Sequence, residues 1–190
     1  MREKLEKVRN RIRKAAEGCG RDPGSVRLVA VCKTMPAEIV RKAIEAGADI
    51  LGENYVQEAR EKIAELSDLK VSWHFIGGLQ SNKAKYVVKL FDLIHSVDSS
   101  KLLHEIDKQA RKNDKVQDIL IQVNIAGEEQ KWGASPEETL DLLRQAGRLA
   151  NISVKGLMTM PPFFDSPEVA RPFFRQLKEM RDGLAEKIQE

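Results

Sequence analysis

The chain has 190 residues, of which 42% are hydrophobic and 32% charged, a composition typical of a globular protein large enough for one core. Its 32 Lys and Arg are interleaved with 29 Asp and Glu, and a net charge of +3 argues against a dedicated nucleic-acid surface. Without a membrane-length apolar run, a signal peptide or a disulfide framework, the sequence predicts a cytoplasmic protein with no membrane partner.

Predicted helices and strands alternate along the chain. An amphipathic helix with its apolar stripe from Leu5 to Ala16 comes first and ends at Gly18. Apolar runs predict strands over residues 27–33, 49–52, 71–76, 93–97, 118–124 and 154–160. Each is followed by a helical pattern, and the last helix carries Pro172, which must lie in its first turn or kink it.

This alternation predicts an α/β fold with a parallel sheet covered by helices. Its spacing fits a (β/α)8 TIM-type barrel with six of the strands visible, in one domain over residues 1–190. An open doubly wound sheet is the alternative, although no Gly-x-Gly-x-x-Gly follows any predicted strand. At the helix starts, Ser81 is expected to act as a cap, and Ser135-Pro136-Glu137-Glu138 predicts a capping box.

Lys33 ends the first predicted strand, whose run Leu28-Val29-Ala30-Val31 suits a strand buried on both faces. Chemistry in α/β folds collects at the C-terminal ends of strands, where a sheltered lysine amine can form a Schiff base. The alternative is a lysine that merely closes the strand with its charge in solvent, and position alone favours that alternative.

Other polar residues follow other predicted strands. Asn54 can orient a ring substituent or cap the next helix, and Asn124 and Met160, with its neighbour Thr159, end later strands. His74 lies between apolar neighbours and is expected in the core. Trp132, in a loop, is expected to pack or to contact a partner rather than to act in catalysis. The start of the helix at Ser81-Asn82-Lys83 could hold an anion. Three histidines without ligand spacing predict no metal site.

Four segments occur together in a recognisable order. They are Ala30-Val31-Cys32-Lys33-Thr34, Gly52-Glu53-Asn54-Tyr55-Val56-Gln57-Glu58, His74-Phe75-Ile76-Gly77 with Leu79-Gln80-Ser81-Asn82-Lys83, and Gly156-Leu157-Met158-Thr159-Met160. Together they resemble the pyridoxal-phosphate homeostasis protein family, relatives of the barrel domain of alanine racemase. The spacing Glu128-x-x-Lys131-x-Gly133 also resembles a loop of that family.

The resemblance implies that the chain binds pyridoxal 5′-phosphate as a Schiff base on Lys33, with Asn54 and Met160 at the cofactor. It also implies a role in intracellular cofactor homeostasis, without catalytic residues, and apo-enzymes that receive the cofactor as possible partners. The chain departs from the family at Gly78, where another residue is usual. Family members continue with two more strands that hold the phosphate, so we expect that the sequence is C-terminally truncated after Glu190.

Two other functions remain open at the level of sequence. One is a racemase or related amino-acid enzyme that uses the same cofactor, although such enzymes need a second base and an added β-domain. The other is an aldolase that forms a Schiff base without a cofactor. A visible absorbance band lost on borohydride reduction would separate the cofactor-dependent functions from the aldolase.

Overall fold

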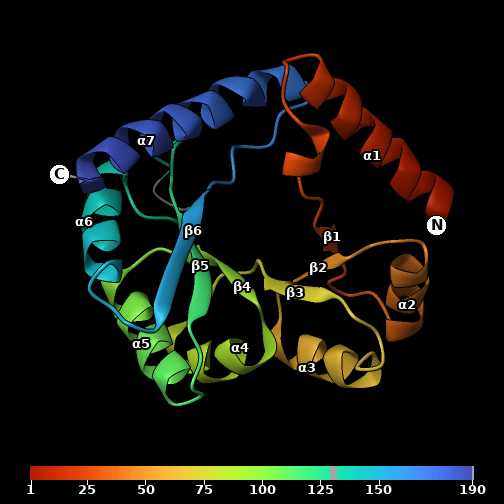
Figure 1. Ribbon diagram of the computed structural model, residues 1–190, viewed down its shortest axis with the longest axis horizontal. Coiled ribbons are helices and arrows are strands. Elements are labelled where there is room, and N and C mark those ends of the chain that lie inside the picture. The colour runs from red at the N-terminus through yellow and green to blue at the C-terminus, as the bar shows by residue number, and fades with distance from the viewer. Residues whose placement is uncertain (129–131, 190) are drawn as a thin grey trace. The chain divides into compact units, whose positions relative to one another are not determined.

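The computed structural model describes residues 1–128 and 132–189 and forms two compact units, one of residues 1–74 and one that begins at residue 75. Helices and strands alternate through both (Figure 1). The strand order of the sheet is β1-β2-β3-β4-β5-β6, the order of the chain. The pairs β1–β2, β4–β5 and β5–β6 are parallel. The α/β prediction is therefore confirmed.

The first unit contains α1 (Arg2–Glu17), the 3-10 turn η1 (Pro23–Ser25), β1 (Ala30–Val31), α2 (Ala37–Glu45), β2 (Ile50–Glu53), α3 (Val56–Glu65) and most of β3 (Ser72–Phe75). Strand β2 is buried along its whole length, and it lies beside β1 with Ala30 opposite Leu51. The buried alanines and valine of α2 and α3 complete this part of the core. They are Ala37, Val40 and Ala59.

Strand β1 is shorter and more exposed than predicted. The strand covers two residues, and the Val31 side chain is 52% exposed, so the expectation of burial on both faces is wrong. Within the described residues β1 stands at one end of the strand order, with β2 as its neighbour. A strand at the end of a sheet has one unpaired edge, so fewer neighbouring side chains cover it than cover a central strand with the same apolar run.

The second unit contains η2 (Ser81–Lys83), α4 (Ala84–Leu90), β4 (Leu93–Val97), α5 (Ser100–Arg111), β5 (Gln117–Gln122), α6 (Pro136–Ala146), β6 (Ile152–Met158), η3 (Pro167–Ala170) and α7 (Arg171–Gln189). Helix α4 packs on α5 and α5 on α6, along one side of these strands (Figure 1). The core side chains of the second unit come from alternate strand positions and from one face of α5. They include Ile94, Leu102, Leu103, Ile106, Ile119 and Ile121.

Two helix starts in the second unit test the sequence predictions directly. The capping box is confirmed, because Glu138 N donates to Ser135 Oγ at 3.2 Å and Ser135 N donates to the Glu138 carboxylate at 2.8 Å. The expected Ser81 cap is wrong. Residues 81–83 form a 3-10 turn, in which Lys83 N donates to Gln80 O at 2.9 Å, and α4 begins only at Ala84.

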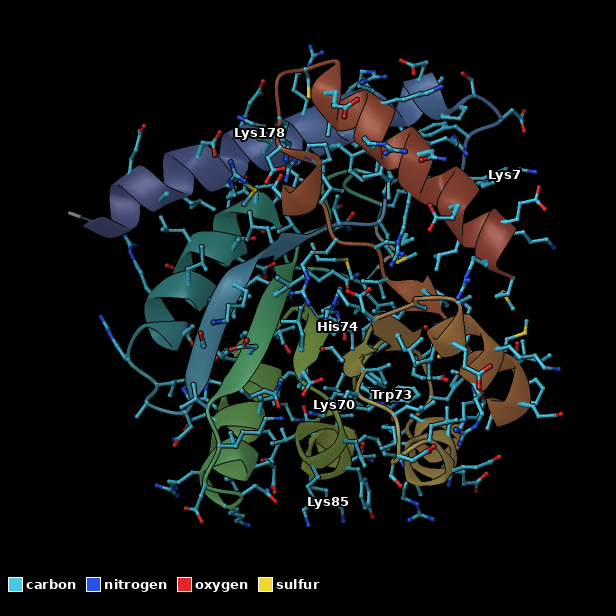
Figure 2. The ribbon with its side chains drawn as sticks, turned by 45° about the vertical axis from the view of Figure 1, so that its right-hand side comes forward. Lys7, Lys70, Trp73, His74, Lys85 and Lys178 are labelled. Atoms are coloured by element: carbon cyan, nitrogen blue, oxygen red, sulfur yellow. The ribbon has the colours of Figure 1, made fainter. Side chains whose placement is uncertain are left out.

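Pro172 and His74 each lie where the sequence predicts. Pro172 lies in the first turn of α7, as its missing N–H requires. In Figure 2 the labelled lysines Lys7, Lys85 and Lys178 project from helices, whereas Trp73 and His74 lie on β3. His74 is 5% exposed, so the prediction of a core histidine is confirmed.

Candidate functional site

Lys33 lies in a tight turn directly after β1. Met35 N donates to Cys32 O at 3.2 Å, which closes a β-turn over Lys33 and Thr34. Thr34 has φ of 60°, a left-handed conformation that turns of this kind usually give to glycine or asparagine. For a β-branched residue this conformation costs about 1–3 kcal/mol and persists only where the surroundings enforce it. The Lys33 side chain is exposed at the end of this turn.

Lys33 and Asn54 follow the ends of two paired strands. Ala30 pairs with Leu51 and Val31 with Gly52, and the pairing continues as Cys32 N donates to Gly52 O at 2.9 Å. Beyond these positions the chain leaves the sheet, since Lys33 lies in a turn and Asn54 follows the last residue of β2. The role of both residues toward a cofactor stays a prediction.

Asn54 does not cap the helix that follows it. The N-cap of α3 is Tyr55, and no side chain caps that helix end. The Asn54 side chain is partly exposed, but its Oδ1 is buried and has no hydrogen-bond partner among the described residues. A buried carbonyl oxygen without a donor costs free energy, so a bound group that supplies one would be favoured there.

A buried charge cluster lies behind the turn. Lys62 Nζ donates to Glu53 Oε1 at 2.6 Å and to Cys32 O at 2.7 Å, and the Cys32 thiol donates to the same Glu53 oxygen at 3.2 Å. Glu53 is 0% exposed and Lys62 is 8% exposed. Removing one partner of such a buried pair leaves the other charge uncompensated, at a cost of about 3–5 kcal/mol.

The Cys32 thiol in this cluster is chemically quiet. Burial, followed by the hydrogen bond to Glu53 and the charge of that carboxylate, raises the pKa of Cys32 from 9.0 to about 12. The reactive form of cysteine is the thiolate, which is scarce far below the pKa. Cys32 therefore acts as a packed hydrogen-bond donor at neutral pH, whereas Cys19 is exposed.

Helix α3 also reaches the other side of the turn. Thr34 N donates to Glu58 Oε2 at 3.0 Å, and Glu58 lies one helical turn before Lys62, with its Oε2 3.7 Å from Lys62 Nζ. Sequence reasoning gave no role to Glu58 or Lys62. Their spacing of four residues on a predicted helix was the available signal, since residues at that spacing share a face.

The predicted residues after β5 and β6 lie in the second unit. Met160 follows β6 and is 63% exposed, and Thr159 Oγ1 donates to Val123 O at 2.9 Å. Asn124 Nδ2 donates to Glu128 O at 2.8 Å, so this amide supports its own loop. The resemblance at Lys131 falls outside the described residues. The role of Met160 toward a cofactor stays a prediction.

Trp132 and the 3-10 turn η2 bear on two more of the sequence predictions. Trp132 lies against Gly78, where an added Cβ would approach the indole ring to 3.4 Å. Trp132 is also 55% exposed, so one part of the ring packs on Gly78 while a partner contact for the rest stays a prediction. The anion site expected at Ser81-Asn82-Lys83 lacks its helix start, because these residues form the 3-10 turn η2.

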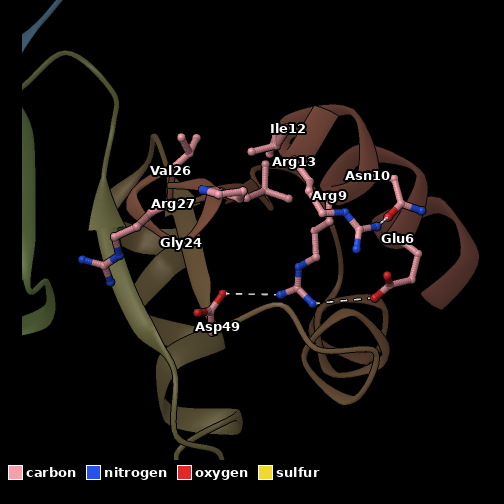
Figure 3. A pocket seen from close by; sticks show the side chains of 11 residues that line it. Glu6, Arg9, Asn10, Ile12, Arg13, Gly24, Val26, Arg27 and Asp49 are labelled. Carbon is pink, nitrogen blue, oxygen red and sulfur yellow. Dashed lines mark hydrogen bonds and ion pairs between the residues drawn. The ribbon is translucent and has the colours of Figure 1, made fainter. Parts of the chain in front are cut away.

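The first unit also holds a cavity of about 430 Å³ between α1 and the residues that precede β1 and β2 (Figure 3). Arg9 crosses it, with its guanidinium 3.8 Å from the Asp49 carboxylate and 3.9 Å from that of Glu6, and it donates to Gly47 O at 2.6 Å. Arg13 and Arg27 also line this cavity, so both signs of charge are present. The cavity lies at the starts of the strands, whereas Lys33 and Asn54 follow the strand ends.

Metal binding and membrane insertion are two other functions on which the described residues bear. No group of three or more His, Cys, Asp and Glu side chains in residues 1–128 and 132–189 is arranged to hold a metal ion. Over the same residues, no helix is both long and apolar enough to cross a bilayer.

Comparison with protein families gives a match over nearly the whole chain. Residues 4–190 match the family model described as alanine racemase, N-terminal domain. A pyridoxal phosphate homeostasis protein of Aquifex aeolicus is 47% identical over 182 residues, which cover 96% of this chain and 80% of that protein. One from Pseudomonas aeruginosa is 41% identical over 178 residues, covering 94% of this chain and 77% of its own.

Solved structures agree with this assignment. PipY of Synechococcus elongatus, solved with pyridoxal phosphate bound, is 34% identical with a TM-score of 0.80, covering 93% of this chain and 82% of that one. An alanine racemase of Clostridium difficile shares the fold with a TM-score of 0.72 at 17% identity, covering 85% of this chain and 43% of that one. The predicted fold, related to the alanine racemase N-terminal domain, is confirmed. The chain belongs to the pyridoxal phosphate homeostasis protein family.

Proposed function

We propose that this protein binds pyridoxal 5′-phosphate covalently through Lys33 and holds it for intracellular cofactor homeostasis. The observation that carries the proposal is an exposed lysine directly after β1 together with a buried Asn54 Oδ1, unpartnered among the described residues, directly after the paired strand β2. A lysine amine and a polar group for the ring are the features that such a cofactor requires. The cofactor-bound structure of the PipY relative supports the choice of ligand.

Each residue has a distinct part in this proposal. When bound, the cofactor would supply an aldehyde that condenses with an amine and releases water. Lys33 would hold the cofactor through its side-chain amine. Asn54 would contact the ring through its side-chain amide, and Met160 would add an apolar contact.

We further propose that the protein holds the cofactor without turning over amino acids. Racemisation needs a proton acceptor and a proton donor at the α-carbon, and the ionisable groups packed behind the Lys33 turn are poorly suited to either task. Glu53 and Lys62 neutralise each other, and the pKa of Cys32 is raised to about 12 by burial. The names of the curated relatives also support a homeostatic function. We propose apo-enzymes as recipients of the cofactor.

Borohydride trapping of purified protein tests the attachment. After incubation with pyridoxal 5′-phosphate and reduction, peptide mass spectrometry should find the label on Lys33, and Lys33→Ala should lose the visible absorbance band while its circular dichroism is unchanged. Lys42→Ala, which changes an exposed lysine of α2, is the matched control and should keep the band. A band retained in Lys33→Ala, or label found on Lys83 alone, would refute Lys33 as the attachment site.

A second measurement separates binding from catalysis. Loss of deuterium from the α-carbon of labelled alanine should proceed no faster with the protein than with the same concentration of cofactor alone. Exchange well above that background, absent in Lys33→Ala, would favour the racemase function.

A further inference from the structure

The Lys33 turn is held at both of its peptide neighbours by one helix. On one side, Lys62 Nζ donates to the carbonyl of Cys32 at 2.7 Å. On the other, the Glu58 carboxylate accepts the N–H of Thr34 at 3.0 Å. The residue between these two contacts is Lys33, so both of its flanking peptide groups are fixed by side chains of α3.

The two contacts hold a strained backbone conformation that would otherwise relax. Thr34 is held with φ of 60°, which a β-branched residue rarely adopts. Its N–H is directed at a carboxylate, and hydrogen bonds to a charged acceptor are stronger than neutral ones. The unusual φ of Thr34 therefore occurs at the residue whose N–H donates to the Glu58 carboxylate. Backbone strain that is held by its surroundings in this way is found mainly at functional sites.

The helix side chains are themselves fixed. Lys62 is 8% exposed and bonds to Glu53 Oε1 at 2.6 Å, and Glu53 ends β2 immediately before Asn54. The same cluster thus connects the Lys33 turn to the strand end that carries Asn54. A rigid support of this kind restricts where the Lys33 amine can lie relative to Asn54.

We propose that Glu58 and Lys62, the α3 clamp, are positioning residues that hold the Lys33 turn in the conformation from which the Lys33 amine reacts. This inference rests on the function proposed above. Glu58 secures the strained half of the turn, and Lys62 secures the carbonyl that closes it. Neither residue forms a bond with the cofactor.

Glu58 is the better residue to test, because its side chain is 40% exposed and its removal leaves the buried Glu53–Lys62 pair intact. Glu58→Ala should slow borohydride-trapped labelling of Lys33 by about tenfold, the factor that corresponds to about 1.4 kcal/mol. Glu58→Gln keeps an acceptor oxygen and should retain most of the rate. Glu61→Ala removes an exposed carboxylate from the same helix and should label like the parent protein.

A double-mutant cycle with Thr34→Gly distinguishes positioning from general stability. Glycine adopts the left-handed conformation at little cost, so the turn should persist without Glu58. Labelling in Thr34→Gly/Glu58→Ala should therefore recover to within about twofold of Thr34→Gly alone, a non-additivity expected for coupled residues. Additive losses, or a Glu58→Ala variant that labels as fast as Glu61→Ala, would overturn the clamp. If Glu58→Ala fails to fold, Glu58→Ser, whose hydroxyl is too short to reach the Thr34 N–H, replaces it in the same cycle.

Amide hydrogen exchange without cofactor separates this inference from the proposed function. The Thr34 and Met35 amides should exchange about tenfold faster in Glu58→Ala than in Glu61→Ala, a free-energy difference of about 1.4 kcal/mol. If exchange responds but no protein labels at Lys33, the turn is clamped and the proposed function is wrong, and with it the purpose assigned to the clamp. If the parent protein labels but neither exchange nor labelling responds to Glu58, the clamp alone is wrong.

Discussion

At the scale of single residues, the side chains near Lys33 divide into several that support the backbone and one that does not. Asn54 does not, because its Oδ1 is buried without a donor among the described residues and the N-cap of the next helix is Tyr55. Cys32, Glu53 and Lys62 support the turn through hydrogen bonds to one another and to Cys32 O, although Glu53 Oε2 is also buried without a partner among the described residues. The two groups should respond differently to substitution.

Asn54→Ala is expected to weaken cofactor affinity while leaving the protein as stable as before. Losing one neutral hydrogen bond weakens the binding free energy by about 0.5–1.5 kcal/mol, which corresponds to roughly a two- to tenfold rise in Kd. Spectroscopic titration and thermal unfolding of the same samples measure both quantities. Asn82→Ala, at an exposed asparagine, is the control. If Asn54→Ala lowers the unfolding temperature and leaves the Kd unchanged, Asn54 has a structural role only.

The two cysteines should differ strongly in reactivity. At pH 8, iodoacetamide should alkylate exposed Cys19 and leave Cys32 unmodified in the native protein, since burial raises the pKa of Cys32 to about 12. Peptide mass spectrometry over time checks this, with unfolded protein as the control in which both react. Equal native rates would contradict the buried cluster.

The same pKa shift predicts the direction of a pH effect on stability. The native state holds the Cys32 proton up to about pH 12, whereas the unfolded chain releases it near pH 9.0. The stabilisation is therefore fully present below pH 9 and declines as pH rises towards 12. Denaturant unfolding of the parent protein and of Cys32→Ala at several pH values isolates this contribution as the difference between the two curves.

At the scale of elements, helix starts show that the same residue type can stabilise one helix and not another. Ser135 caps α6 through its hydroxyl, with Pro136 at the first helical position. Ser99 occupies the corresponding position of α5 without a side-chain bond to the helix. The free energy of capping therefore depends on the geometry achieved, not on serine at the position.

Ser135→Ala is expected to lower the free energy of unfolding by about 1 kcal/mol, because the Glu138 N–H loses its acceptor. Ser99→Ala is the matched control, at an N-cap without that hydrogen bond, and should cost less. Urea unfolding of the three proteins gives the comparison. Equal losses in both variants would show that the capping box contributes nothing specific.

At the scale of the whole molecule, a ligand that binds the native state alone must stabilise it. Pyridoxal 5′-phosphate at a hundred times its Kd should add about 2.7 kcal/mol to the free energy of unfolding. For a chain of this size each kcal/mol raises Tm by about 2–4 °C. Scanning calorimetry should show this shift in the parent protein and in Lys42→Ala, but a much smaller one in Lys33→Ala. An equal shift in Lys33→Ala would mean that covalent attachment adds nothing to affinity.

The sequence by itself determined the alternation of helices and strands, the bounds of β4, the capping box of α6 and the positions of Lys33 and Asn54 after consecutive strands. These features depend on hydrophobic periodicity and turn chemistry within a few residues, which a sequence displays directly. The resemblance of the four segments then identified the family and its cofactor, which the pattern alone left open.

Only the tertiary structure decided how the Lys33 turn is supported. The Thr34–Glu58 hydrogen bond joins residues 24 positions apart, and the Lys62–Cys32 bond joins residues 30 positions apart. Both depend on the β1–β2 register and on which face of α3 is buried, and neither can be read from local sequence. The left-handed Thr34 and the short, exposed β1 also depend on tertiary context, the first through its hydrogen bond to Glu58 and the second through its place at the end of the strand order of the described residues.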